Sequence, residues 1–164
     1  MVTDLRTTRN SERMVIMITI DLRDEISFSI PGEPQGKVNM RPYKRGDFLT
    51  LVNPSHNKNY MSLVRDAWHE TEAIKIPDNH CVYLEIRAYF QIPKSISKKK
   101  REKMLSGSIR PTKKPDCDNI SKVICDALNG IAFHDDSMIV GLEVEKFYSE
   151  NPCVVVVIRS CENE

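Results

Sequence analysis

The clearest strand pattern in the chain is an alternation of apolar and more polar residues between Val82 and Ile92. The apolar positions are Val82, Leu84, Ile86, Ala88, Phe90 and Ile92. Residues two apart lie on the same face of an extended chain, so this segment is predicted to form a β-strand with one apolar face. Strands are also predicted at 26–30 and 138–148, and the apolar run at 154–158 is typical of a buried strand.

Two other segments place residues of an apolar stripe at helical spacing. The first follows Pro54, and its stripe consists of Tyr60, Val64, Ala67, Trp68, Thr71 and Ile74. The second, at 120–128, stops at Asn129-Gly130, a pair that commonly terminates helices. Because Trp68 belongs to the first stripe, we interpret it as a core residue rather than as a base-stacking group.

Helices and strands are mixed along the chain without strict alternation, and a length of 164 residues suits one domain. We therefore predict an α+β fold, a single domain in which a mixed β-sheet packs against helices. The domain is expected to span residues 25–160, and residues 1–24 are expected to form a flexible N-terminal extension.

The composition argues against several classes of protein. Five cysteines at irregular spacings contain no Cys-x-x-Cys pair, which favours reduced thiols in a cytoplasmic protein over a disulfide framework or a zinc site. No apolar run is long enough to span a membrane, so a membrane is not an expected partner. The net charge of +1 names no partner by itself, but the basic residues are unevenly distributed.

A cationic segment runs from Lys94 to Lys114 and contains nine lysines and arginines but only one acidic residue, Glu102. Such side chains can neutralise backbone phosphates without reading base sequence. A solvated lysine-rich helix capped by Ser97 is the alternative interpretation. A second basic stretch, 35–53, is predicted to be a loop. The candidate DNA-binding residues of the two stretches are Lys37, Arg41, Lys98, Lys99, Lys100, Arg101, Lys113 and Lys114.

The cationic segment leads directly into two carboxylates, Asp116 and Asp118, just before the second predicted helix. In an extended entry segment, residues two apart point the same way, so both carboxylates could face one point. Neighbouring carboxylates repel each other unless a cation lies between them, and all-oxygen ligands suit Mg²⁺ or Mn²⁺. The alternative is that Asp118 serves only as the N-cap of the helix.

Charged residues continue along that helix. Asp118, Lys122 and Asp126 lie at i, i+4 and i+8, on one helical face. A lysine one turn from a metal-binding aspartate could neutralise charge that develops on a phosphate, but an ordinary surface ion pair would have the same spacing. A second acidic pair, Asp135-Asp136, follows the helix, and by itself it is also typical of a turn before a strand.

The order of these motifs closely resembles that of the RusA family of Holliday junction resolvases, which are common in phages and prophages. The resemblance is carried by Lys-Pro-Asp-Cys-Asp-Asn-Ile-Ser-Lys at 114–122, Asp-Ala-Leu-Asn-Gly at 126–130 and Asp-Asp-Ser-Met-Ile at 135–139. Pro-Lys-Ser at 93–95 and Ile-Pro-Gly-Glu-Pro at 30–34 are similar to the same family. The similarity extends from Ile26 to Ile158.

This resemblance implies a homodimeric, Mg²⁺-dependent endodeoxyribonuclease that cuts four-way DNA junctions in recombination and repair, with Mn²⁺ able to substitute. The implied catalytic residues are Asp116, Asp118, Lys122 and Asp136, of which the three aspartates bind the metal. The residues expected to support them are Asn119, Asp126 and Asp135. Two other functions fit the residues: a non-catalytic module that binds branched DNA, and a metal-dependent enzyme acting on a small phosphorylated substrate.

Overall fold

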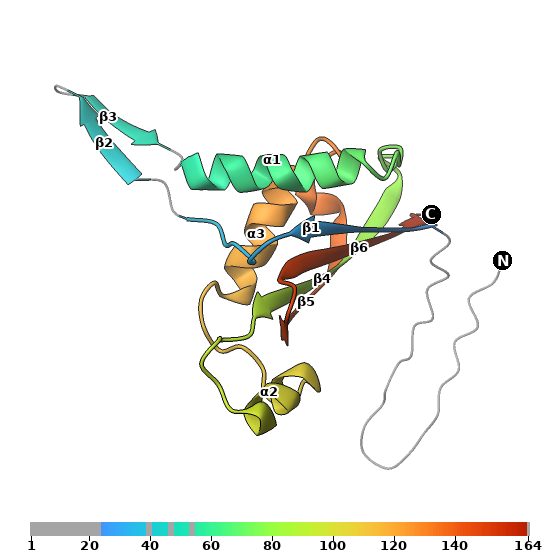
Figure 1. Cartoon of the computed structure of the whole chain (residues 1–164). Coiled ribbons are helices and arrows are strands. Elements are labelled where there is room, and N and C mark those ends of the chain that lie inside the picture. The colour runs from blue at the N-terminus through green and yellow to red at the C-terminus, as the bar shows by residue number, and fades with distance from the viewer. Residues whose placement is uncertain (1–23, 39–40, 46–47, 53–54, 164) are drawn as a thin grey trace, which may run out of the picture.

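The computed structural model describes residues 24–38, 41–45, 48–52 and 55–163, and its centre is a four-stranded sheet (Figure 1). The strands are β1 (Asp24–Pro31), β4 (His80–Gln91), β5 (Ile139–Ser149) and β6 (Cys153–Glu162), in the order β1-β6-β4-β5. Strand β4 is antiparallel to β6 and parallel to β5, so the sheet is mixed. The four predicted strands and the predicted α+β class are confirmed.

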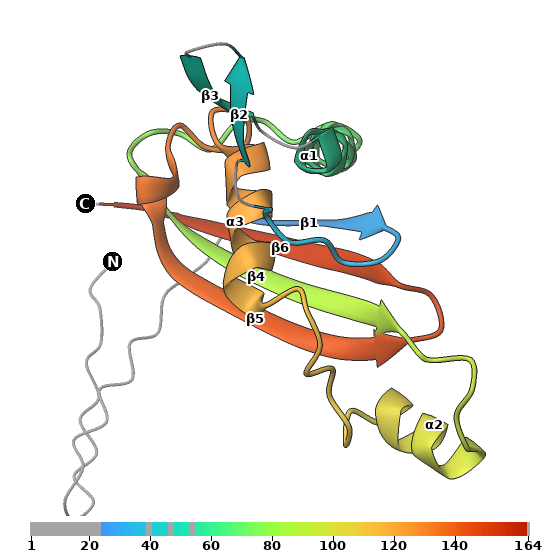
Figure 2. The same cartoon turned by 90° about the vertical axis from the view of Figure 1, so that its left-hand side faces the viewer.

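Three α-helices of the described residues accompany the sheet: α1 (Ser55–His69), α2 (Lys98–Leu105) and α3 (Cys117–Leu128). Helices α1 and α3 lie on the same face of the sheet, whereas α2 projects beyond the ends of β4 and β5 (Figure 2). Parallel neighbouring strands need a crossover connection. The connection from β4 to β5 contains α2, α3 and the short 3₁₀ helix η1 (Asp136–Met138). Among the described helices, none has the length and apolar character needed to cross a membrane.

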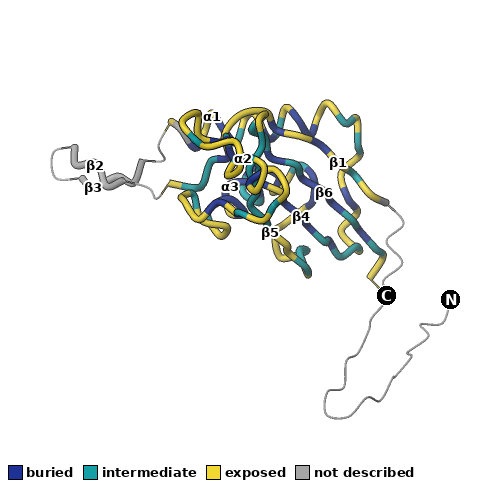
Figure 3. The backbone as a smooth tube through the Cα atoms, turned by 60° about the horizontal axis from the view of Figure 1, so that its bottom comes forward, coloured by how far each residue is buried: buried dark blue, intermediate teal, exposed yellow. Residues whose placement is uncertain are grey.

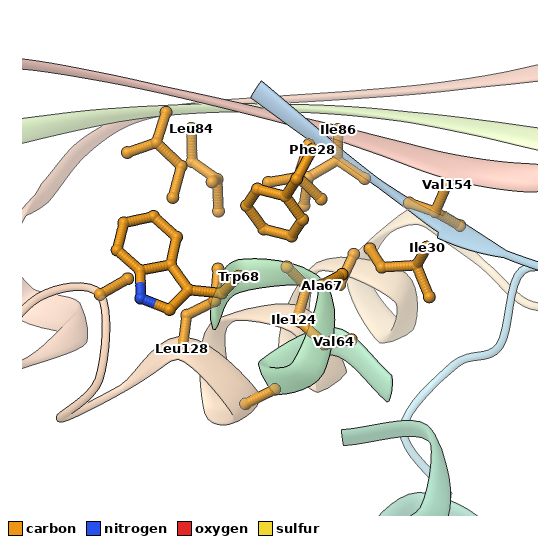
Figure 4. Packing of buried hydrophobic residues seen from close by; sticks show 14 of the residues in the cluster. Phe28, Ile30, Val64, Ala67, Trp68, Leu84, Ile86, Ile124, Leu128 and Val154 are labelled. Carbon is orange, nitrogen blue, oxygen red and sulfur yellow. The ribbon is translucent and has the colours of Figure 1, made fainter. Parts of the chain in front are cut away.

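The hydrophobic core fills the space between the sheet and helices α1 and α3 (Figure 4). Side chains that meet there include Leu84, Ile86, Ile124 and Leu128. Trp68 of α1 is 2% exposed, and its ring meets that of Phe28 from β1 edge to face, with centroids 6.0 Å apart and an interplanar angle of 77°. The interpretation of Trp68 as a core residue is confirmed.

Helix α1 is shorter than its sequence stripe predicts. It ends at His69, so Thr71 and Ile74 lie beyond it, and Ile74 is 83% exposed. The Thr71 hydroxyl donates to the carbonyl of Trp68 at 2.7 Å, a local bond that competes with continuation of the helix. Glu72 has φ 56°, a left-handed conformation that a right-handed helix cannot contain. The predicted continuation of the stripe past His69 is therefore wrong.

The prediction that the basic stretch 35–53 is a loop is wrong, because part of it forms two strands. Strands β2 (Arg41–Arg45) and β3 (Phe48–Val52) pair antiparallel, from Arg41 opposite Val52 to Arg45 opposite Phe48. Figure 1 shows this hairpin extending away from the sheet and the helices. The sequence signal for it is the run of β-forming residues Phe-Leu-Thr-Leu-Val in β3. The predicted N-terminal extension covers residues 1–24, of which 1–23 lie outside the described residues, and Asp24 belongs to β1.

Burial is concentrated in the central strands and on the inner sides of α1 and α3 (Figure 3). Strand β5 forms one edge of the sheet, and its Val140 and Leu142 are 59% and 50% exposed. Helix α2 buries only Met104, so its other side chains lie at or near the surface. This distribution leaves the cations of α2 and the N-terminal end of α3 accessible to a large ligand.

Candidate active site

Asp116 and Asp118 lie at the N-terminal end of α3, but not in the extended arrangement that the sequence suggests. The helix begins at Cys117, so only Asp116 is extended, with φ −77° and ψ 157°, and Asp118 is in the first helical turn. The N-cap position belongs to Asp116, which corrects the alternative assignment of Asp118 as the cap. The Asp116 side chain makes no capping hydrogen bond, and both residues are exposed. Capping therefore does not account for either carboxylate.

Lys122 lies one turn after Asp118, as predicted. Its Nζ is 3.4 Å from Asp118 Oδ2, and the two side chains are 60% and 63% exposed. An ion pair this exposed contributes only about 0.3–0.5 kcal/mol to helix stability. Stability alone therefore gives little reason for this pair, and both groups can reach a ligand at the surface.

Asp126, one of the predicted supporting residues, is paired with Lys37. The Lys37 Nζ is 2.5 Å from Asp126 Oδ2, and each side chain is about one third exposed. The Lys37 backbone N–H also donates to the carbonyl of Asn119 at 2.8 Å. Lys37 was predicted to contact DNA. In the structure its ammonium forms an ion pair with Asp126, and its backbone N–H bonds α3.

The neighbours of Lys37 complete this attachment. A Cβ added to Gly36 would lie 2.6 Å from Pro115 Cβ and 3.0 Å from Asn119 Cβ, so only glycine lets the chain come this close to α3. The Asn57 side chain of α1 accepts from the Val38 N–H at 3.0 Å and donates to the Val38 carbonyl at 2.8 Å. The segment 36–38 therefore joins α1 to the start of α3 immediately before the β2–β3 hairpin.

The second acidic pair forms a helical turn immediately before strand β5. Asp136 is the first residue of η1, and Asp135 is its N-cap, whose carboxylate accepts from the Ser137 N–H at 2.9 Å. The hydrogen bonds from Ser137 lower the pKa of Asp135. Strand alternation cannot separate the two carboxylates, because neither residue belongs to β5. Their environments nevertheless differ, because Asp135 is engaged in capping.

Asp136 lies close enough to α3 to affect a thiol on it. The pKa of Cys125 is raised to about 11, mainly by burial and further by the negative charges of Asp136 and Asp126. Cys125 is seven residues, or two turns, after Asp118. Asp136 therefore lies near the second half of α3, where Asp126 also lies, and not beside Asp118 at the start of the helix. Within the described part of the chain, however, no three His, Cys, Asp or Glu side chains converge closely enough to hold a metal ion.

The donor set still suits Mg²⁺. This ion usually keeps several waters and binds through one or two carboxylates together with substrate phosphates, rather than in an all-protein cage. Asp116 and Asp118 offer two exposed carboxylates at the positive end of a helix dipole, where negative charge is favoured. Full coordination then requires oxygens from water, from the substrate or from a shift of Asp136.

The predicted DNA-binding cations divide into two groups. Lys98, Lys99 and Lys100 form the first turn of α2 and are exposed. Arg101 is instead bound to Glu150, with its Nη2 2.8 Å from the carboxylate. Ser97 occupies the N-cap position of α2, as predicted, although its hydroxyl makes no capping bond.

The two predicted DNA-binding lysines that precede α3 in the sequence are exposed, and one of them also contacts an aromatic ring. Lys113 and Lys114 lie at the surface, and Lys113 Nζ is 5.1 Å from the centre of the Phe90 ring. The side chain of Arg41 lies outside the described residues.

Sequence reasoning missed Gly36 and Lys146 as contributors to the site, since an isolated glycine and a lysine within a strand pattern give no specific signal.

Comparison with known proteins gives two matches. A family model described as Endodeoxyribonuclease RusA matches residues 31–159. The chain is also 40% identical over 141 residues to the uncharacterized protein YqaN of Bacillus subtilis (strain 168). That alignment covers 83% of this chain and 96% of YqaN. The family match includes all four residues predicted to be catalytic, from Asp116 to Asp136.

Proposed function

The chain belongs to the RusA family of endodeoxyribonucleases, and from this membership we propose that it is a divalent-metal-dependent enzyme that cuts four-way DNA junctions in recombination and repair. The observation that carries the proposal is the pair of exposed carboxylates at the start of α3. Asp118 pairs with the exposed Lys122, and neither Asp116 nor Asp118 makes a side-chain capping bond. Metal-assisted cleavage of a phosphodiester gives both carboxylates and the lysine a role.

Asp116 and Asp118 would hold Mg²⁺, or Mn²⁺ in its place, with Asp136 as a third carboxylate. When bound, the ion would activate the attacking water and stabilise charge on the phosphate oxygens. Lys122 would add positive charge on the same side of α3, where it can neutralise charge that builds on the phosphate in the transition state. Asp135 would act only indirectly, by capping η1 and so fixing the backbone that carries Asp136.

The DNA arms would lie against the cations that the fold leaves exposed. Lys98, Lys99 and Lys100 on α2 and the pair Lys113-Lys114 before α3 are suited to backbone phosphates, which they would neutralise without reading sequence. Arg41 of strand β2 stays a proposed DNA contact on the basis of the sequence. We assign Lys37 and Arg101 to ion pairs within the protein instead.

We further propose that the enzyme acts as a homodimer. A four-way junction has two strands to cut at symmetry-related positions. Two copies related by a two-fold axis would present two equivalent active sites to them through one self-complementary interface.

The test uses the purified full-length chain with four-way junction, linear duplex and single-stranded DNA, with Mg²⁺ and with a chelator. Mg²⁺-dependent nicking of the junction in preference to the other substrates is expected. A protein that binds junctions but cuts nothing would be a binding module, and activity confined to small phosphate esters would point to a different enzyme class.

Substitutions then assign the carboxylates. Asp118→Asn and Asp136→Asn should each abolish cleavage while junction binding is kept or tightened, because each removes negative charge at constant side-chain size. Asp135→Asn should retain a measurable share of activity, since it removes a cap rather than a ligand. Asp66→Asn, at an exposed position of α1, is the matched control and should cleave like the wild type. Loss of folding in Asp118→Asn would favour a purely structural role.

A further inference from the structure

We propose that Lys146 of β5 is a positioning residue for Asp116, acting through the backbone that precedes it. Its Nζ donates hydrogen bonds to the carbonyls of Lys113 and Pro115, the latter at 3.0 Å. Pro115 is the residue immediately before Asp116. One ammonium group on the sheet therefore binds two carbonyls of the irregular segment that leads to Asp116 and α3.

The position of Lys146 in the sheet explains why its ammonium needs hydrogen bonds from the protein. Lys146 is paired in register with Ala88, whose side chain is buried on the face that carries the helices. A cation directed to that side is costly unless hydrogen bonds replace its water. Two carbonyls supply those bonds, and the ring of Phe90 lies 5.1 Å from Nζ, within cation–π range.

Arg110 fastens the same segment to β5 a few residues earlier. Its Nε donates to the carbonyl of Lys146, and its Nη2 bonds Glu145 at 3.0 Å. Its guanidinium also stacks on Phe147, 3.6 Å from the ring centre. The chain between α2 and α3 is thus attached to one stretch of β5 at two places, through Arg110 and through Lys146.

Pro115 is confined from a second side by Gly36, which packs against it from the segment before the hairpin. With Lys146 holding the carbonyl and Gly36 against the ring, the backbone at Asp116 has little freedom to shift. Asp116 itself has no side-chain capping bond that would orient its carboxylate. The direction of this carboxylate therefore depends on the backbone, and the backbone depends on Lys146.

This inference rests on the proposed nuclease function, in which Asp116 holds the metal. A displacement of about 1 Å at a reacting group can cost about 100-fold in rate. Loss of the Lys146 bonds should therefore lower the cleavage rate and raise the Mg²⁺ concentration needed for half-maximal activity. Junction affinity should hardly change, because the ammonium is already occupied by carbonyls.

The experiment compares the wild type with Lys146→Met, which keeps the side-chain stem and removes the donors, and with Lys146→Arg, which keeps charge and donors. Lys75→Met, at an exposed position remote in sequence from the site, is the matched control. Single-turnover cleavage, Mg²⁺ titration, junction affinity against salt and amide hydrogen exchange of residues 113–118 are measured. Lys146→Met should cleave about 10–100 times more slowly, need more Mg²⁺ and exchange faster at 113–118, with partial rescue by Lys146→Arg.

Wild-type cleavage and Mg²⁺ dependence in a folded Lys146→Met would overturn the inference. So would weaker binding with a shallower salt dependence, because this would make Lys146 a phosphate contact. If Lys146→Met fails to fold, Lys146→Gln takes its place, and full activity at wild-type Mg²⁺ would have the same meaning. An inactive wild type would instead refute the proposed function, and hydrogen exchange at 113–118 would still show whether Lys146 holds this segment.

Discussion

Gly36→Ala tests whether the contact between the pre-hairpin segment and α3 is as tight as the structure indicates. The added Cβ would lie 2.6 Å from Pro115 Cβ and 3.0 Å from Asn119 Cβ, whereas carbon atoms pack at about 3.5–4.0 Å. Neither neighbour can yield easily, since one is in a proline ring and the other is the first side-chain carbon of a helical residue. Overpacking of this kind costs about 1–3 kcal/mol.

The unfolded chain partly offsets that cost. Replacing glycine by alanine removes freedom from the unfolded state and stabilises the fold by about 0.4–1 kcal/mol. The net loss for Gly36→Ala should be about 1–2 kcal/mol, which for a domain of this size lowers Tm by about 3–8 °C. Cleavage should also slow, because the Lys37 N–H to Asn119 bond and the position of Pro115 are disturbed together.

Gly141→Ala provides a matched control. Its added Cβ would also lie 2.6 Å from a carbon atom, but this atom is Cδ1 of the half-buried Tyr83 ring, which can rotate away. Thermal melting followed by circular dichroism should place Gly141→Ala within about 2 °C of the wild type. Equal melting temperatures for Gly36→Ala and Gly141→Ala, with equal cleavage rates, would refute the close packing of Gly36 on α3.

Two further predictions concern the charges around α3. Asp136→Asn should lower the pKa of Cys125 from about 11, because it removes a negative charge that disfavours the thiolate, and alkylation of this thiol at mildly alkaline pH should become faster. Peptide-resolved mass spectrometry measures this rate, and an unchanged rate would contradict the proximity of Asp136 to α3. Replacing the three lysines at 98–100 by glutamine should weaken binding to all DNA forms alike, and should reduce the slope of log affinity against log salt by up to about 0.9 per lost phosphate contact. A slope equal to that of the wild type would leave these lysines as a solvated helix face.

The parts of the fold that the sequence predicts are those with local periodicity and a buried face. Strand β4 alternates over its length, and its inward side chains from Val82 to Phe90 are buried. Helix α3 ends where Asn129-Gly130 indicates, with Gly130 at φ 75°. Such patterns are readable because burial on one face imposes the period of the element on the sequence. The end of α1 escaped prediction because a single hydroxyl bond and one left-handed residue decide it.

The candidate site was predictable in its residues but not in its geometry. The ordered motifs point to Asp116, Asp118 and Lys122. The helix, however, already starts at Cys117, so the two aspartates do not share one extended segment. The sequence shows the charge of Lys37 but not its ion-pair partner, because Asp126 is 89 residues away (126 − 37). The contacts of Lys146 cannot be predicted from the sequence for the same reason. Its role follows only from the register that places β5 beside β4.

The attachments around α3 have a common physical consequence. Lys146 and Gly36 act on the backbone at Pro115, and Lys37 acts on Asn119 and Asp126, but these contacts leave the carboxylates of Asp116 and Asp118 exposed. A metal-binding carboxylate must keep its oxygens available and yet be held in place before the ion arrives. Direct hydrogen bonds to the oxygens would fix the side chain at the expense of ligation. Under the proposed function, fixing the backbone instead would meet both demands, and the N-terminal dipole of α3 offsets part of the repulsion between the two charges in the absence of a metal ion.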